Sequence, residues 1–507
     1  MDTSRRTFLK SGLLTSTLGL NLNAATKTPI NDPTCGPVIG GKKFKFLNEP
    51  IRIRKSFYDL TDDELKNLCR AVGYMRKNIP LNSSLQWESY ARIHAYHCTL
   101  EEGINNNVPQ VHWSWHFLPW HRGYIYFLER ILDNILKKNF GWNGIAFAYP
   151  YWDWSNHQEM PNTKIRKQSG LASPLFGYDL TQEDMVSADN LDFDNLALYD
   201  GNRKPTVSEP TMDPNNEVSV DSKQHIIEAK WYMSNDYINA ILKAPFEIFG
   251  GKSVTDRNTG QGLLEQGPHN DGHDWVGTRY GNNRNMGTLR YAANDPIFFM
   301  HHANIDRIFS LYNQQMPDID GPWGKQSYTY VDIDGSPVTV TVKDIMTKMI
   351  NVKYHSPSDE PIKLTSVINT NIPKSVTIPV TGMLTSNGLT LDIPDSEKLK
   401  ELINLKSNLS TLTVETGPIS YTDKFKIKVS VNGNGVGRIN ILDGRQPENN
   451  ITTSHDFTMS IGIGKQSLTN NLNTTFSGYP KTVRLVLNNV RDKNFKLMIR
   501  SLTFTVI

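Results

Sequence analysis

Residues 111–122 carry the pattern from which this chain can first be interpreted: Val111-His112-Trp113-Ser114-Trp115-His116-Phe117-Leu118-Pro119-Trp120-His121-Arg122. Apolar residues continue at spacings of three and four from Trp120 to Lys138, which predicts a helix that starts at this histidine cluster. A single histidine beside tryptophan is most often a hydrogen-bonded core or surface residue. The case for a metal therefore depends on whether other histidines share this aromatic setting.

Two further groups do share it. They are Ile93-His94-Ala95-Tyr96-His97-Cys98 and a split group, Glu265-Gln266-Gly267-Pro268-His269-Asn270-Asp271-Gly272-His273-Asp274-Trp275 with Asn294-Asp295-Pro296-Ile297-Phe298-Phe299-Met300-His301-His302-Ala303-Asn304-Ile305-Asp306-Arg307. Together the three groups hold nine of the 13 histidines. His269 and His273 are four residues apart, which on a helix places both imidazoles on one face. The clustering predicts a metal site built from imidazoles.

The residue types around these histidines favour copper. The Glu-x-x-His sets of di-iron bundles are absent. The three cysteines (Cys35, Cys69 and Cys98) are too few for a structural zinc or iron–sulfur site. Imidazole-only coordination suits copper, because neutral ligands do not over-stabilise Cu(II) and so keep Cu(I) accessible. The composition therefore favours two copper ions over zinc or iron.

In order and spacing, the segments resemble the copper sites of the type-3 dicopper family of tyrosinases, catechol oxidases and haemocyanins, most closely the plant-type polyphenol oxidases. The resemblance covers about residues 60–354. It implies that the first copper is held by three histidines and the second copper by three others, which are His94, His112 and His121, then His269, His273 and His302. It also implies that the second member of the pair His301-His302 is the ligand.

The remaining histidines receive weaker assignments. His97 is an alternative to His94, although the His-x-x-x-Cys spacing favours His94. His116 and His301 have no ligand counterpart in the family and are expected to pack or hydrogen-bond near the site. Those without any motif are expected at the surface, namely His157, His225, His355 and His455.

The resemblance implies three further site features. Cys98 corresponds to a cysteine that forms a thioether to the second ligand of the first copper, here His112; the alternative is an ordinary buried thiol. Cys35 and Cys69 would then be left, and the spacing does not decide whether they form a disulfide. Glu265 and Asn270 match the pair that holds a proton-accepting water for monophenol substrates; the alternatives are a helix-start carboxylate and a turn residue.

Two positions bear on substrate choice. Plant enzymes often place a phenylalanine gate thirteen residues before the last ligand, and that position is Leu289 here. A leucine lacks a stacking face, so access for ring-substituted substrates should be easier, unless Leu289 only packs in a loop. Asp274, directly after His273, adds a carboxylate that could favour amine-bearing phenols.

The expected fold has two parts. The first is a mainly α core domain, a helical bundle that holds the dicopper site and carries long loops; helices are expected from Asp62 through Met75 and within residues 84–100. The second is an all-β sandwich, because Lys424–Val431 and three later segments alternate with period two between Asn/Gly turns. The expected domains are residues 1–25 (signal peptide), 26–354 (catalytic), 355–362 (linker) and 363–507 (C-terminal domain, which could cover the active site).

The N-terminus resembles a twin-arginine export signal, because Arg5-Arg6 precedes a short apolar run, Leu13–Leu22. It predicts contact with export machinery and a periplasmic or secreted protein; the alternative is a disordered basic start. The apolar run is too short for a membrane span. With a formal charge of +3 and no basic stripe, nucleic acid and anionic membranes are not expected partners.

The predicted function is that of a dicopper polyphenol oxidase. Such an enzyme uses O2 to hydroxylate monophenols, to oxidise ortho-diphenols to ortho-quinones, or both, and in plants it stays latent until the C-terminal domain is removed. The nearest alternative is a diphenol-only catechol oxidase. A haemocyanin-like oxygen carrier and a copper-storage protein are alternatives from other classes. The C-terminal domain could instead be a permanent stabilising or carbohydrate-binding module.

Overall fold

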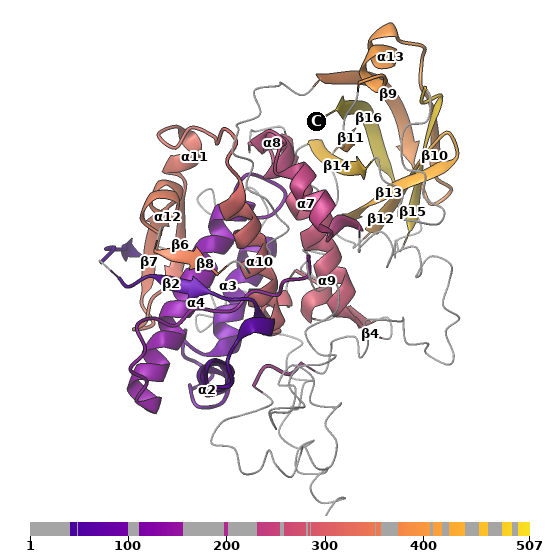
Figure 1. Ribbon diagram of the computed structural model, residues 1–507. Helices are drawn as coiled ribbons and strands as arrows, with labels where there is room; N and C mark the ends of the chain where they lie inside the picture. Colours follow the sequence, from indigo (N-terminus) through magenta and orange to yellow (C-terminus); the bar gives the residue numbers. More distant parts are fainter. Residues whose placement is uncertain are drawn as a thin grey trace, which may run out of the picture.

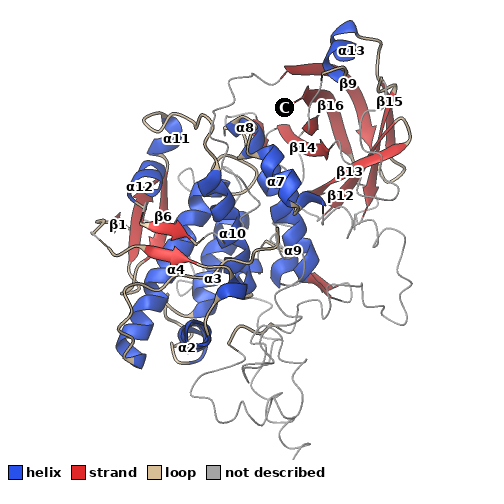
Figure 2. Ribbon diagram, in the orientation of Figure 1, coloured by secondary structure: helices blue, strands red, loops and turns tan. Residues whose placement is uncertain are grey.

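The computed structural model describes the catalytic part of the chain and most strands of the C-terminal part. The described residues are 41–47, 49–99, 111–155, 197–200, 231–253, 258–279, 282–283, 285–289, 291–349, 351–355, 374–405, 409–417, 425–441, 456–464, 479–488 and 495–506. Helices gather in the first part and strands in the second (Figure 2). The predicted fold class, a helical core followed by an all-β domain, is confirmed.

Helix α4 (Phe117–Phe140) is the centre of the helical domain. It packs against α2 (Asp62–Lys77) and α10 (Ile297–Leu311), and α3 (Trp87–Thr99) lies beside them (Figure 1). The side chains that fill this core are mostly aromatic and fully buried, Trp120, Tyr124 and Phe127 among them. All three helices expected before residue 140 are therefore present, with ends within about three residues of the expected ones.

Local sequence sets where these helices begin and how closely they approach other elements. Thr61 and Glu64 form a reciprocal capping box at the start of α2, which satisfies two backbone N–H groups. In α4, a Cβ on Gly123 would lie 2.4 Å from the Tyr330 hydroxyl. Gly123 thus lets Tyr330 reach the helix and donate a hydrogen bond to the Trp120 carbonyl at 2.9 Å.

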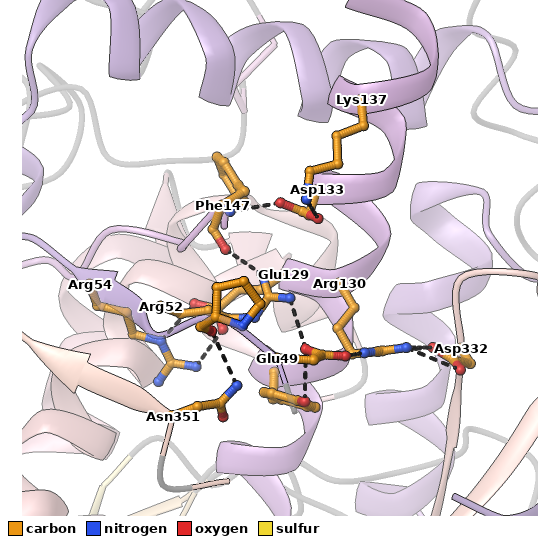
Figure 3. Close-up of polar contacts among 12 residues, drawn as sticks. Glu49, Arg52, Arg54, Glu129, Arg130, Asp133, Lys137, Phe147, Asp332 and Asn351 are labelled. Atoms are coloured by element: carbon orange, nitrogen blue, oxygen red, sulfur yellow. Dashed lines mark hydrogen bonds and ion pairs between the residues drawn. The ribbon is translucent and has the colours of Figure 1, made fainter. Parts of the chain in front are cut away.

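Short strands and a buried ionic network fasten the ends of this domain to α4. The strand β2 (Arg52–Arg54) pairs in parallel with β8 (Val352–Tyr354), and β1 (Lys42–Lys43) joins the hairpin of β6 (Ser327–Val331) and β7 (Pro337–Thr341). Figure 3 shows the fully buried Arg54 guanidinium donating to both carboxylate oxygens of Glu129 on α4, at 2.7 and 3.0 Å. On the same helix, Arg130 pairs with Asp332 at 3.0 Å. Fully buried charges of this kind are stable only when paired.

The other described elements of the catalytic part are short. They are η2 (Phe57–Asp59), α7 (Asn235–Ile241), α8 (Phe246–Phe249), β3 (Asn258–Gly260), η4 (Glu265–His269), α9 (Asn270–Gly277), β4 (Thr278–Arg279), β5 (Asn282–Asn283), η5 (Asn285–Gly287), η6 (Ala292–Asn294), α11 (Pro322–Lys325) and α12 (Val342–Lys348). Within the described ranges, no helix is both long enough and apolar enough to span a lipid bilayer.

The C-terminal domain is a pair of packed sheets. In the described part of the chain, one sheet has the order β10-β15-β12-β13 and the other the order β3-β14-β11-β16-β9. The strands are β9 (Lys374–Leu384), β10 (Leu389–Asp392), β11 (Leu409–Thr416), β12 (Phe425–Val431), β13 (Asn434–Ile441), β14 (Asp456–Gly464), β15 (Thr482–Asn488) and β16 (Leu497–Val506). The alternating apolar residues of β12 and β15 face the core, as predicted. A helix, α13 (Glu397–Ile403), was not expected.

Strand β3 shows that the two domains share a sheet. It belongs by sequence to the catalytic part, yet it pairs in parallel with β14 at the edge of the C-terminal sheet. Helices α7 and α9 lie between α10 and this domain (Figure 1). The predicted signal peptide and most of the predicted linker lie outside the described residues. The first residue of that linker, His355, still bonds to the catalytic domain through Arg54 and Tyr151.

Candidate metal centre

The first group of imidazoles comes from two helices and the loop between them. His94 lies on α3, His112 in the loop before α4, and His121 on the first turns of α4. All three side chains are buried, and one nitrogen of each lies within 4.8 Å of the others. These are the three residues expected for the first copper, and the packing of α3 on α4 brings them together.

The second group lies on the helical run that ends in α9 and on α10. His269 ends the π-helical segment η4, His273 lies on α9, and His302 lies on α10. These rings are also buried and meet the same 4.8 Å limit. The expected simple helical spacing is thus modified by a wider π turn, a feature often found at functional sites. Both rings still reach one point.

The two groups, called here the first and second triads, face each other directly. The rings of His121 and His302 are stacked, with centroids 4.1 Å apart and planes 8° apart. Phe298 packs against His94 and His302, and Phe117 packs against His121 and His269. Each phenyl ring thus packs on one ring of the first triad and one ring of the second, so the two triads form a single cluster with aromatic neighbours.

Hydrogen bonds at the Nδ1 atoms test whether these rings fit a metal. The Nδ1 of His121 lies 2.8 Å from the Phe117 carbonyl, and that of His273 lies 2.8 Å from the Met286 carbonyl. A carbonyl only accepts, so each Nδ1 carries the proton and each Nε2 keeps its lone pair for a metal. The Nε2 of His121 has no hydrogen-bond partner although it is buried. The Nε2 of His273 lies 3.4 Å from the Nε2 of His302.

That 3.4 Å separation suits two ligands of one ion, since metal–imidazole bonds are about 2.0–2.1 Å long. The charge state suits a metal as well. Burial is the main cause that lowers the pKa of His121 to about 3 and the pKa of His94, His112, His269 and His302 well below 6.5. Neighbouring histidines lower most of these values further. These five rings are therefore neutral, as metal ligands must be. The two triads fit a binuclear copper site.

Glu265 ties the two triads together. Its carboxylate oxygens accept the Trp113 backbone N–H at 2.8 and 3.1 Å, and Oε1 also accepts from the Gln261 amide at 3.3 Å. Trp113 directly follows His112 and has a left-handed backbone with φ of 61°, a conformation that costs about 1–3 kcal/mol. Burial raises the pKa of Glu265 to about 8, although both hydrogen bonds oppose the shift.

The two other predicted site residues also reach the centre. The carboxamide oxygen of Asn270 accepts from the Nδ1 of His269 at 2.9 Å. Asn270 therefore orients one imidazole of the second triad. Leu289 is buried, and its backbone forms a hydrogen bond with His94 that raises the pKa of that ring, against the larger effect of burial.

The secondary histidines behave as expected where they are described. His116 bonds to Tyr328 and Trp115, and His301 bonds to Trp154 and to the His269 carbonyl. His97 is buried beside Trp120 but belongs to neither triad. His355 is exposed. Those outside the described residues are His157, His225 and His455, as is Cys35; Cys98 lies on α3, but its side chain is not among those described.

Residues of the C-terminal domain also contact α9. These contacts were not expected from the sequence. Arg438 on β13 pairs with Asp271 at 2.8 Å, and Lys426 on β12 pairs with Asp274 at 2.8 Å. Both carboxylates are about 1% exposed, so Asp274 has a cationic partner already. Burial raises the pKa of Asp271 to about 6, and Arg438 opposes that shift. The regular lysine face of β12 was the available signal, but nothing in the sequence indicated its partner.

Two tyrosines of the catalytic domain fill the rest of this interface. A Cβ on Gly437 of β13 would lie 2.6 Å from the Tyr232 hydroxyl, and one on Gly462 of β14 would lie 2.6 Å from the Tyr237 ring. Any larger residue at either glycine would therefore push the tyrosines away. The close fit shows that the C-terminal domain is packed directly on α7 and the residues just before it.

Comparison with known proteins follows this geometry. Residues 84–315 match the common central domain of tyrosinase, and this range contains all six triad residues. The chain is 29% identical over 345 residues to the latent chloroplastic polyphenol oxidase of Prunus armeniaca, covering 66% of this chain and 52% of that protein. It is 28% identical over 349 residues to the chloroplastic polyphenol oxidase of Spinacia oleracea, covering 64% and 51%.

The chain spans about half the length of the curated relatives it matches. Among solved structures, recombinantly expressed latent aurone synthase, a polyphenol oxidase, has a TM-score of 0.61 at 22% identity. The match covers 94% of each chain. At this identity the likeness establishes the fold, a helical core joined to a C-terminal β domain.

Proposed function

We propose that this chain, whose residues 84–315 match the common central domain of tyrosinase, is a dicopper polyphenol oxidase. It would use O2 to oxidise ortho-diphenols to ortho-quinones and to hydroxylate monophenols. The observation that carries the proposal is the pair of buried imidazole triads that face each other through the stacked rings of His121 and His302. The tyrosinase family holds two copper ions in such a centre.

The chain's residues would hold those ions in the order expected from the sequence. One ion would bind the first triad, His94, His112 and His121, and the other the second triad, His269, His273 and His302. When bound, the copper pair would supply the reaction with O2 and accept electrons from the phenol. Carbonyl and carboxamide oxygens bonded to Nδ1 atoms keep the rings oriented for this.

Glu265 and Asn270 would handle the proton of a monophenol. A phenol has a pKa near ~10, so it is almost wholly neutral at working pH. Hydrogen bonds from Trp113 and Gln261 hold the Glu265 carboxylate beside the triads. Its two oxygens have more lone pairs than these two donors use. A water on this carboxylate would accept the phenolic proton. The raised pKa of Glu265 lies close to the working pH, where a carboxylate is an effective base.

We expect Glu265→Gln to lower tyramine turnover by about 100-fold and catechol turnover much less, in the range of general-base effects. A carboxyl group with a raised pKa is protonated below that pKa. Monophenol turnover should therefore fall as pH falls through it, and the variant should lose this dependence. The neighbouring Gln266→Met, which removes an amide bonded to the C-terminal Arg438 carbonyl, is the control. Equal losses on both substrates would indicate a purely structural role.

Leu289 and the C-terminal domain would govern the access of phenols to the metal centre. Leu289 would replace the aromatic gate of plant enzymes and admit ring-substituted phenols more easily. The C-terminal domain would keep the enzyme latent. Two buried ion pairs, two tyrosine–glycine contacts and the shared strand β3 support this role, because they hold the domain on α9, α7 and β3. The catalytic domain would comprise residues 26–354 and the cover residues 363–507.

A thioether between Cys98 and His112 is part of the proposal. It would fix one imidazole of the first triad and reduce its reorganisation. Copper-loaded protein should then yield a cross-linked peptide that joins Cys98 to His112 by mass spectrometry. Metal-free protein should yield little of it. Recovery of only alkylatable Cys98 from active enzyme would contradict the bond.

The proposal also includes export. A twin-arginine-type signal over residues 1–25 would direct the protein to the periplasm or outside the cell through the export machinery. The plant relatives carry chloroplastic in their names, so they too are directed to a compartment. An exported oxidase would benefit from a cover that delays quinone release.

One experiment separates the functional alternatives. Copper-loaded protein, with and without the C-terminal domain, is assayed with O2 against tyramine and catechol, and its absorption is recorded with hydrogen peroxide. We expect both substrates to be turned over. Turnover of catechol alone would indicate a catechol oxidase. A spectral response without turnover of either substrate would indicate an oxygen carrier and contradict the proposal.

A further inference from the structure

His301 lies next to a ligand of the second triad without belonging to it. Its ring is fully buried, and its Nε2 lies 3.1 Å from the backbone carbonyl of His269. Its Nδ1 lies 3.1 Å from the indole nitrogen of Trp154. The ring also lies nearly parallel to that of His269, with centroids 5.6 Å apart and planes 20° apart. One side chain of α10 thus contacts the turn that carries His269.

The tautomer of His301 follows from its two partners. An indole N–H can only donate, so Nδ1 of His301 must be the acceptor. A backbone carbonyl can only accept, so Nε2 must carry the proton and donate it to His269. The two contacts therefore require the same neutral tautomer, and each supports the other. By donating to Nδ1, Trp154 fixes the proton of His301 on Nε2, the atom that donates to the second triad.

The carbonyl that accepts this bond lies at a sensitive place in the backbone. His269 ends the π segment η4 and α9 begins at Asn270, so the helical hydrogen-bond pattern changes at this point. A donor from another helix can stabilise a carbonyl in such an irregular turn. Gly272 leaves room for the His301 ring because it has no side chain. A Cβ at this position would lie 2.3 Å from that ring.

We propose that His301 is a positioning residue for the second triad: it holds the π turn through the His269 carbonyl, in the tautomer that Trp154 selects. The held turn keeps His269 and His273 directed at one point. Without the bond, the turn can relax towards a regular helix, and the two imidazoles no longer converge. This inference rests on the proposed function only in so far as the second triad binds copper.

The test measures copper affinity at each triad separately, by chelator competition on metal-free full-length protein. The His121→Ala background reports the second triad, and the His302→Ala background reports the first. In the His121→Ala background, which reports the second triad, His301→Phe should weaken copper binding about 10–100-fold, the usual cost of losing an outer-shell partner. In the second background the same change should alter copper binding less than about 3-fold, because no bond from His301 reaches the first triad.

Conservative variants separate positioning from packing. Trp154→Phe keeps an aromatic ring but removes the indole donor, so it should weaken the second site in the same direction as His301→Phe. The double variant should be no weaker than His301→Phe alone, since both act through one bond. His301→Gln, whose amide can donate near the Nε2 position, should recover most of the affinity, whereas His301→Asn should not.

A matched control comes from His116, which is also buried and also bridges a tryptophan and a second residue, here the Tyr328 hydroxyl. His116→Phe should leave affinity at the second triad unchanged. Equal weakening by His116→Phe, equal effects at both triads, or full additivity of Trp154→Phe and His301→Phe would each overturn the proposal. Failure of the two backgrounds to bind one copper each would instead contradict the proposed metal centre.

Discussion

Each of the variants His121→Ala and His302→Ala is expected to lose copper from its own triad and to lower catechol oxidation by more than about 100-fold. Changes to outer-shell partners already cost about 10–100-fold at metal sites, and these two rings are themselves candidate ligands. They stack on each other at 4.1 Å across the centre. Loss of either should therefore disable the pair, although the other triad remains.

Copper per chain is measured by elemental analysis after dialysis, alongside the rate with catechol. His116→Ala is the matched control, because His116 is buried in the turn before α4 and bonds to Tyr328 rather than to the triads. It should lower thermal stability and keep two coppers. If His121→Ala or His302→Ala also retains two coppers per chain, the ligand assignment is wrong.

The second large effect is expected on removal of the C-terminal domain. Cleavage between Ser356 and Pro361, which lie outside the described residues, followed by separation of the two parts should raise catechol oxidation several-fold at unchanged copper content. Exposed connections between domains are the usual sites of proteolytic cleavage. Because ion pairs, tyrosine contacts and β3 also hold the domain, cleavage without separation should activate less.

The ion pairs allow the same effect to be tested in the uncut chain. Replacing both cations, in Lys426→Met with Arg438→Met, leaves Asp271 and Asp274 buried without these partners. Breaking a buried pair from one side costs about 3–5 kcal/mol, and 1.4 kcal/mol is a tenfold change in an equilibrium. Basal catechol oxidation should therefore rise towards the several-fold increase expected on complete removal of the domain, and should not exceed it.

Arg484→Met is the matched control, since Arg484 is exposed on β15 and bonds to Thr390 within the same domain. It should leave the basal rate unchanged. Unchanged or lower activity after clean removal of the domain would contradict a latency role. It would support a permanent stabilising or carbohydrate-binding module instead.

The helical domain was readable from sequence because its signals are local. The capping residues of α2 and the apolar spacing of α4 depend on neighbours within a few positions, and the structure places both helices close to the predicted ends. The alternation in β12 and β15 is equally local, because successive side chains of a strand point to opposite faces. The short helix α13 carries a weaker pattern and was missed.

The six triad histidines were also identified from the sequence, because each sits in a recognisable segment whose order along the chain is informative. What the residues next to them do was not predictable in the same way. Asn270 is expected to help hold a water, and the sequence did not indicate that its carboxamide oxygen also accepts a bond from His269. Asp274 was expected to be available to substrates, and it is paired with Lys426. Each of these contacts depends on which atom faces which.

The sequence by itself therefore determined the two domain types and favoured copper bound by imidazoles, since short-range periodicity and histidine clustering suffice for these. The assignment of six histidines to two triads came from the resemblance of their segments to the type-3 dicopper family. Only the tertiary structure decided what the C-terminal domain covers, which strand it shares with the catalytic part and which tautomer His301 adopts. Those features arise where residues far apart in the chain meet: Lys426 with Asp274, β14 with β3, and His301 with Trp154. A lysine on one face of a strand has the same pattern whether it meets water or a buried carboxylate, and only packing distinguishes the two.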